Sequence, residues 1–113
     1  MDSFQVKVIQ EVKDFIASED IVVFKWRTCP YCVDAMRALD ADKKSYKAIE
    51  VNEEQRSLLF EVTKQESVPS IWIKGKFIGG CNDGPESWMG VKPLIKSGKL
   101  NELLAAPRVT PVF

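Results

Sequence analysis

Residues 21–36 read IVVFKWRTCPYCVDAM and carry the strongest indication of the fold. It opens with the apolar, β-branched run Ile21–Phe24, which is typical of a strand buried on both faces. Two cysteines, Cys29 and Cys32, follow after a short polar segment. Apolar residues then recur at helical spacing, at Val33, Met36 and Leu39. The stretch therefore predicts a buried strand, a turn with a Cys-x-x-Cys pair, and a helix.

The flanking segments alternate between helical and extended patterns. We expect a helix over residues 3–18, a strand over Lys47–Val51, and a third helix that Asn52 and Gln55 open with a capping box. A tight hairpin is expected at residues 71–78, turning at Lys74-Gly75. The pattern then predicts interrupted helices, the first starting at Asp83–Glu86 with Pro85 at an early position and breaks at Gly90, Pro93 and Gly98.

This order of elements indicates an α/β sandwich. A parallel βαβ unit followed by a hairpin builds a small mixed sheet with helices packed against it. The length of 113 residues fits one domain over 1–113. Residues 106–113 contain two prolines, and we expect them to form a loose tail.

Composition excludes several classes of function. Sixteen basic residues balance sixteen acidic ones, so a nucleic-acid or membrane partner is not expected. The chain has no His, which removes His bases and His metal ligands. It has three Cys and no visible secretory signal, which favours a reducing compartment, and we expect the cytoplasm.

The Cys-x-x-Cys pair is the main candidate for chemistry. A turn between strand and helix places Cys29 at a helix N-terminus, where free N–H groups stabilise a thiolate. Lys25 and Arg27 add positive charge, and Cys32 lies within one turn and can resolve a mixed disulfide. The alternatives are half of a metal knuckle or two inert thiols. A zinc site needs about four ligands, whereas only Cys81 is left, so we expect no metal.

Two further segments carry weaker signals. Val68-Pro69 precedes a strand, which is ordinary for proline, but beside the cysteines the Val68 backbone could meet an extended thiol peptide. Gly79 and Gly80 permit close backbone approach. Asp83 could hold an ammonium group or simply cap a helix, and Cys81 fits a packed small hydrophobe better than a catalyst.

Together these segments resemble the dithiol glutaredoxins. The matching blocks, over about residues 4–105, are Cys29-Pro30-Tyr31-Cys32, Ser67-Val68-Pro69 and Gly79-Gly80-Cys81-Asn82-Asp83. The resemblance implies a thioredoxin-like fold, with a four-stranded mixed sheet flanked by helices. It also implies glutathione as co-substrate, no bound cofactor, and a monomer.

The resemblance further implies a reaction. Cys29 would take glutathione from glutathionylated proteins, and a second glutathione would release it as glutathione disulfide. Cys32 would resolve the intermediate formed with disulfide-bonded proteins. Glutathione reductase and NADPH would be the indirect source of electrons. The implied glutathione-binding residues are Lys25, Tyr31, Arg56, Val68, Pro69, Asn82 and Asp83.

Within that set, the resemblance assigns parts of glutathione to particular residues. Tyr31 would flank the groove, and Val68 would pair its backbone with the cysteinyl part beside a cis Pro69. Asn82 and Asp83 would hold the γ-glutamyl end. The glycine carboxylate would meet Arg56, which could equally be an exposed helix residue.

The chain departs from the family pattern in three places. Trp26 stands where many relatives have Lys, and Glu66 stands where a basic residue is common. Residues 84–90 look like an insertion. Within it, Trp88 could wall the groove or contact protein substrates, or it could be ordinary core.

Two other functions compete with this interpretation. One is a dimer that bridges an iron–sulfur cluster through Cys29 and glutathione, which Pro30 disfavours. The other is a thioredoxin-type reductant fed by a flavoprotein reductase. The absence of the Trp-Cys-Gly-Pro-Cys motif and the presence of the Gly79-Gly80-Cys81 block disfavour it.

Overall fold

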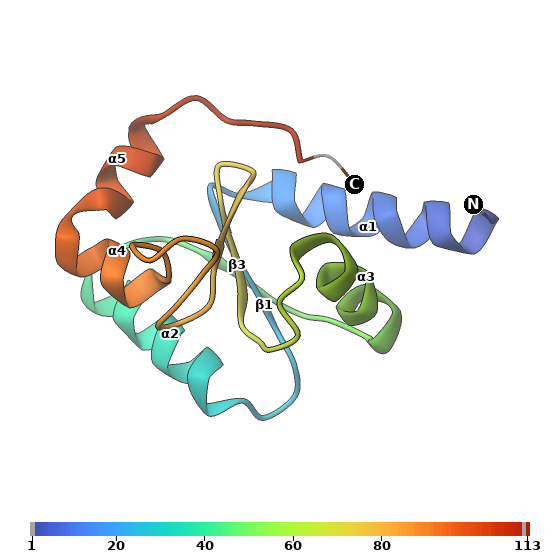
Figure 1. Cartoon of the computed structure of the whole chain (residues 1–113), viewed down its shortest axis with the longest axis horizontal. Coiled ribbons are helices and arrows are strands. Elements are labelled where there is room, and N and C mark those ends of the chain that lie inside the picture. The colour runs from blue at the N-terminus through green and yellow to red at the C-terminus, as the bar shows by residue number, and fades with distance from the viewer. Residues whose placement is uncertain (1, 112) are drawn as a thin grey trace.

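The computed structural model describes residues 2–111 and 113. Five helices and four strands follow one another along these residues (Figure 1). Their order and bounds are α1 (Ser3–Ser18), β1 (Ile21–Lys25), α2 (Pro30–Ala41), β2 (Lys47–Glu50), α3 (Glu53–Thr63), β3 (Ser70–Ile73), β4 (Lys76–Gly79), α4 (Val91–Ser97) and α5 (Lys99–Ala105).

The four strands form one mixed sheet in the order β2-β1-β3-β4. β1 pairs parallel with β2 and antiparallel with β3, and β4 pairs antiparallel with β3. The βαβ unit and the hairpin predicted from the sequence are therefore confirmed. The turn from β1 to α2 therefore lies at the carboxyl end of the parallel pair β1 and β2.

Helices cover both faces of the sheet, as Figure 1 shows. On one face Ile21 and Val23 pack with residues of α2, α4 and α5. On the other face Val22 and Phe24 pack with residues of α1 and α3. Side chains of a strand alternate between faces, so β1 supplies both cores, and its apolar run Ile21–Phe24 is buried, as predicted.

Local signals set most of the element boundaries. Asn52 and Gln55 form the predicted capping box at the start of α3. Asp2 and Gln5 form a second capping box at α1. The hairpin turns at Lys74 and Gly75, which both have positive φ (53° and 85°), as a two-residue turn between twisted strands requires.

The helix start expected at Asp83–Glu86 is wrong. Residues 84–90 contain no helix, and α4 begins at Val91. This loop folds back onto β4, where the Gly90 N–H donates to the Ile78 carbonyl (2.9 Å). Pro93 does not break α4 but lies in its first turn, where its missing N–H is not needed. Gly98 does separate α4 from α5, with φ 83°.

The segment after α5 has no regular structure but makes several contacts. It runs back from α5 toward α1 (Figure 1). The Val109 N–H donates to the Lys74 carbonyl (2.9 Å), Arg108 forms an ion pair with Asp20, and the ring centroid of Phe113 lies 5.9 Å from that of Trp72. The described residues include no helix with the length and apolar character needed to cross a bilayer.

Candidate active site

Cys29 is the N-cap of α2, as predicted from its place after β1. Its Sγ accepts a hydrogen bond from the backbone N–H of Cys32 (3.2 Å) and lies 3.8 Å from the Val68 carbonyl oxygen. The sulfur thus lies at the N-terminus of α2, beside a backbone N–H group, and the thiolate is the form of such a sulfur that reacts with disulfides.

Cys32 lies in a different environment from Cys29. It is 1% exposed, whereas Cys29 is 9% exposed. Burial, followed by the hydrogen bond with the Cys29 side chain, raises the pKa of Cys32 from its ordinary value of 9.0 to about 12. The Trp26 backbone and the Lys25 charge oppose this rise only in part. Cys32 is therefore a neutral thiol at neutral pH, and Cys29 is the thiol that can meet a substrate.

A groove of about 270 Å³ adjoins the cysteine pair. The structure brings together Tyr31, Ser67, Val68, Pro69, Gly80, Cys81, Asn82 and Asp83 in its lining. The Val68–Pro69 peptide bond is cis. Larger hollows occur elsewhere on the molecule, but this groove meets the residue whose carbonyl contacts the Cys29 sulfur. This groove is therefore the candidate substrate groove, chosen by its place beside the Cys29 sulfur and not by its volume.

Two devices hold the groove walls in place. Gln65 Nε2 donates to the carbonyls of both Ser67 and Pro69 (3.1 Å each), which ties the loop before β3. Gly79 has φ 101°, and a Cβ there would lie 2.3 Å from the Asp83 carbonyl oxygen. Sequence reasoning missed Gln65, because a single polar residue at a helix end carries no pattern.

Five of the seven predicted glutathione-binding residues line this groove, and two do not. The guanidinium of Arg56 lies 5.1 Å from the ring centroid of Trp26, and that of Arg27 lies 4.8 Å from the same ring. Lys25 is half-buried at the end of β1, where its charge acts on Cys32. Arg27 and Arg56 thus lie on the Trp26 ring, and neither they nor Lys25 line the groove.

None of residues 84–90 lines the groove, although Gly90 packs on its wall, where a Cβ would lie 2.6 Å from the Asp83 backbone nitrogen. Trp88 is 36% exposed, so the expectation that it belongs to the core is wrong. It does not line the groove beside Cys29 but borders a separate hollow with Trp72 and Phe77. The ammonium groups of Lys76 and Lys99 lie 5.7 and 5.5 Å from its ring centroid. Trp88 is therefore positioned by cation–π contacts on the surface.

Cys81 is a packed thiol. It is 3% exposed and belongs to the core on the α2 face of the sheet, as expected. Burial raises its pKa. Within residues 2–111 and 113, no three His, Cys, Asp or Glu side chains gather closely enough to hold a metal ion.

Comparison with known proteins agrees with this geometry. The glutaredoxin family model matches residues 21–78. Glutaredoxin-C4, chloroplastic, from Oryza sativa subsp. japonica is 40% identical over 83 residues, which are 69% of this chain and 62% of that protein. Glutaredoxin-C2 from Arabidopsis thaliana is 37% identical over 101 residues, which are 85% of each protein.

The solved structures include a close match in fold. The crystal structure of a buckwheat glutaredoxin–glutathione complex superposes with a TM-score of 0.75 at 29% identity, covering 92% of this chain and 94% of that one. The matched family segment contains β1, the cysteine pair, Val68-Pro69 and most of the hairpin, and the groove residues 80–83 follow closely after it. The chain belongs to the glutaredoxin family, and it is a glutathione-dependent thiol–disulfide oxidoreductase with a Cys-x-x-Cys pair.

Proposed function

We propose that Cys29 is the nucleophile that removes glutathione from glutathionylated proteins, and that Cys32 resolves intermediates formed with protein disulfides. One observation carries this division of labour: the Cys29 sulfur lies at a helix N-terminus against the groove, whereas Cys32 is sealed behind it as a neutral thiol. In this proposal the Cys29 thiolate attacks first, and Cys32 reacts only after it has lost its proton.

The first step transfers glutathione. The Cys29 thiolate attacks the glutathione sulfur of the mixed disulfide, a new S–S bond forms, and the protein sulfur leaves as a thiolate that takes up a proton from water. In the second step the thiolate of another glutathione attacks the glutathione sulfur bound to Cys29. Glutathione disulfide departs and the Cys29 thiolate returns, so the cycle consumes two electrons and needs no His base.

A protein disulfide takes a different path. Cys29 forms a mixed disulfide with one protein sulfur and releases the other. Cys32 then loses its proton and attacks the Cys29 sulfur, which frees the protein thiol and leaves a Cys29–Cys32 disulfide. Two glutathione molecules reduce that disulfide.

Glutathione fits the groove beside Cys29 by chemistry. The Val68 backbone stands next to the reacting sulfur and suits the cysteinyl part, beside Pro69. The carboxylate of Asp83 and the amide of Asn82 suit the ammonium and carboxylate of the γ-glutamyl end, and the ring of Tyr31 forms a flank. The relative from buckwheat was crystallised as a glutathione complex, which supports this placement.

Lys25 and Arg56 have a secondary role in the proposal. Their charges would attract the glycine carboxylate, but Arg56 must leave the Trp26 ring to contact it. We therefore expect these two residues to affect the association rate of glutathione more than its affinity.

The wider setting also belongs to the proposal. We expect a monomer that receives electrons from glutathione, with glutathione reductase and NADPH as their indirect source. Three unpaired thiols suit a reducing compartment, and we place the protein in the cytoplasm. The rice relative is described as chloroplastic, so fractionation of the source cells would test this placement.

The test is reduction of a glutathione mixed disulfide, coupled to glutathione reductase and NADPH. Wild type, Cys29→Ser and Cys32→Ser are compared, with Cys81→Ala as the control thiol variant. We expect loss of activity in Cys29→Ser and retention in Cys32→Ser and Cys81→Ala. Activity that survives Cys29→Ser in a folded protein would overturn the assignment of the nucleophile.

A further inference from the structure

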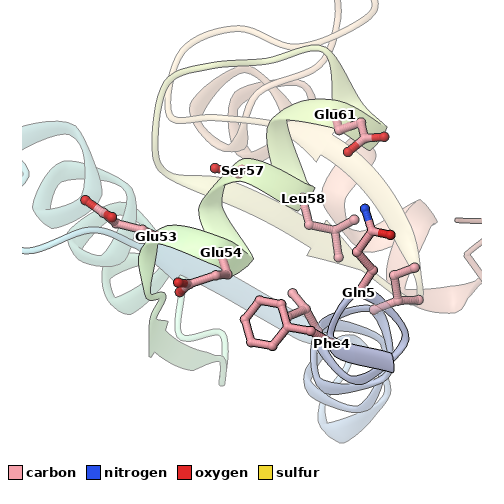
Figure 2. Close-up of a pocket in the computed structure, with 9 residues that line it drawn as sticks. Phe4, Gln5, Glu53, Glu54, Ser57, Leu58 and Glu61 are labelled. Carbon is pink, nitrogen blue, oxygen red and sulfur yellow. The ribbon is translucent and has the colours of Figure 1, made fainter. Parts of the chain in front are cut away.

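A second groove, unrelated to the thiol groove, lies between the N-terminal half of α1 and one side of α3. Its volume is about 400 Å³. Figure 2 shows the Phe4 ring and the Leu58 side chain between the two helices, with carboxylates of α3 around them. The lining consists of Phe4, Gln5, Val8, Ile9, Glu53, Glu54, Ser57, Leu58 and Glu61.

The groove combines an apolar floor with a rim of one charge sign. Four of its residues are apolar, and Phe4 is 56% exposed although it belongs to a helix that buries other apolar residues. Glu53, Glu54 and Glu61 are its charged residues, and the lining contains no Lys or Arg. Within the described residues none of these three carboxylates forms an ion pair.

Folding accounts for only part of this pattern. Glu53 and Glu54 lie in the first turn of α3, where they favour the helix dipole. Glu61 lies near the other end of the same helix, where a carboxylate is unfavourable. Likewise an exposed aromatic ring at position 4 adds little to the core. The acidic rim and the uncovered ring both suit a partner better than the isolated fold.

We propose that this groove docks a basic amphipathic segment of a partner protein. Apolar side chains of the segment would cover Phe4 and Leu58, and its Lys or Arg side chains would meet Glu53, Glu54 and Glu61. The apolar floor supplies affinity, and the single charge sign selects the partner.

Other occupants fit less well. A second copy in a twofold dimer would set one acidic rim against another. The chain's own C-terminal segment is held elsewhere, through Arg108 on Asp20 and Phe113 on Trp72. An anionic lipid surface would be repelled by the same three carboxylates.

Docking here leaves the chemistry free. None of the nine lining residues lines the groove beside Cys29. A partner could therefore be held on α1 and α3 while Cys29 reacts, and the inference goes beyond the proposed function without depending on it.

The test is a titration of the full chain with a peptide, in which heteronuclear NMR detects binding. The probe is an amidated Leu/Lys peptide of about 14 residues, enough for four helical turns. The matched control peptide has Glu in place of every Lys. We expect saturable shifts at the lining residues with the Lys peptide, weakened when salt rises from about 50 mM to about 500 mM. The Glu peptide should bind at least about tenfold more weakly, because like charges would face each other.

Protein variants distinguish binding at this groove from non-specific binding of the peptide. The double variant Glu54→Gln/Glu61→Gln should weaken binding of the Lys peptide about five- to tenfold. The control is Glu102→Gln, an exposed carboxylate of α5 outside the groove, which should change nothing. All three residues are exposed, so circular dichroism should show intact folding.

Each contrary result is decisive. Equal affinity for the Lys and Glu peptides, shifts that map outside the groove, or no loss in the double variant would overturn the proposal. Activity on the glutathione mixed disulfide should be unchanged in the double variant without peptide. If the wild-type protein were inactive on the glutathione mixed disulfide, that result would count against the proposed function, and the peptide titration would still test the docking proposal.

Discussion

Cys32 should make the reduction of protein disulfides strongly dependent on alkaline pH. Burial is the first cause of its raised pKa, and we expect this burial to persist when Cys29 is occupied in a mixed disulfide. The step that needs the Cys32 thiolate should therefore be slow at neutral pH and should accelerate as pH rises. Removal of glutathione, which in the proposed function does not use Cys32, should not share this dependence.

The pKa gives the magnitude. A shift from 9.0 to about 12 lowers the thiolate fraction at neutral pH about 1,000-fold. A more basic thiolate is also a better nucleophile, which recovers about 15- to 30-fold for a Brønsted coefficient of 0.4–0.5. The net slowing relative to an open thiol is therefore at most roughly 30- to 60-fold. It is an upper bound because the contributions from the Cys29 thiol disappear in the mixed disulfide.

The assay is stopped-flow reduction of a disulfide-linked peptide pair that carries a fluorophore on one chain and a quencher on the other. The first phase, loss of quenching, reports attack by Cys29, which separates the chains. The second phase, a fall in anisotropy of the fluorophore chain retained on Cys29, reports its release by Cys32. The logarithm of the second rate should rise by about one per pH unit from pH 7 to about 10.5. Cys32→Ser should lack the second phase, and Cys81→Ala should retain it.

A plateau below about pH 9.5 would refute the reasoning. It would mean that Cys32 titrates like an open thiol and that the burial seen beside Cys29 does not persist in the intermediate. A second rate that does not depend on pH would place proton loss elsewhere, for example in a conformational opening of α2.

The same burial should appear in stability. The folded protein keeps the Cys32 proton to about pH 12, whereas the unfolded chain releases it near pH 9.0. The stabilising contribution is thus complete below pH 9 and is lost as pH rises toward 12. The free energy of unfolding should fall by about 1.4 kcal/mol per pH unit in that window. Denaturant titrations of wild type and Cys32→Ala should differ in this slope, and equal slopes would contradict it.

Three further substitutions test the groove and the C-terminal segment. Asp83→Asn should raise KM for the glutathione mixed disulfide about tenfold with little change in kcat, whereas Asp34→Asn, outside the groove, should not. Gly79→Ala should impair glutathione binding, since its Cβ would lie 2.3 Å from the Asp83 carbonyl oxygen. The control is Gly98→Ala, where φ is also positive but nothing lies within 4 Å of the added Cβ; it should cost about 1 kcal/mol of stability and leave binding intact. Phe113→Ala should remove a contact with a buried aromatic ring and lower stability by about 0.5–1.5 kcal/mol, and an unchanged Tm would show that the segment is loose in solution.

Features of the fold that rest on local patterns could be predicted from the sequence. The apolar run of β1, the capping box at Asn52 and the turn at Lys74-Gly75 each act within a few residues. Because βαβ crossovers and hairpins have few packing solutions, these local elements nearly determine the sheet order. The position of Cys29 at a helix start followed from the same strand-to-helix change.

Features that depend on distant contacts could not be predicted. Pro85 resembles a helix start, but residues 84–90 form a loop on β4, where the Gly90 N–H donates to the Ile78 carbonyl. The contacts of Phe113 with Trp72 join positions remote in the sequence. The placement of Arg56 on Trp26 is of the same kind, because a helix pattern fixes the face of a residue and not the ring it contacts.

The burial of Cys32 links the stability of α2 to the rate of the dithiol step. An enzyme that only removes glutathione needs one reactive thiol, and in the proposed function Cys29, at the turn after β1, has that role. Holding the second thiol one helical turn away places it inside the core, since that face of α2 packs on the sheet. The burial that stabilises α2 therefore also keeps Cys32 protonated. Stability of the helix and speed of the dithiol step are opposed, so a variant that exposes Cys32 should reduce protein disulfides faster at the cost of a weaker core.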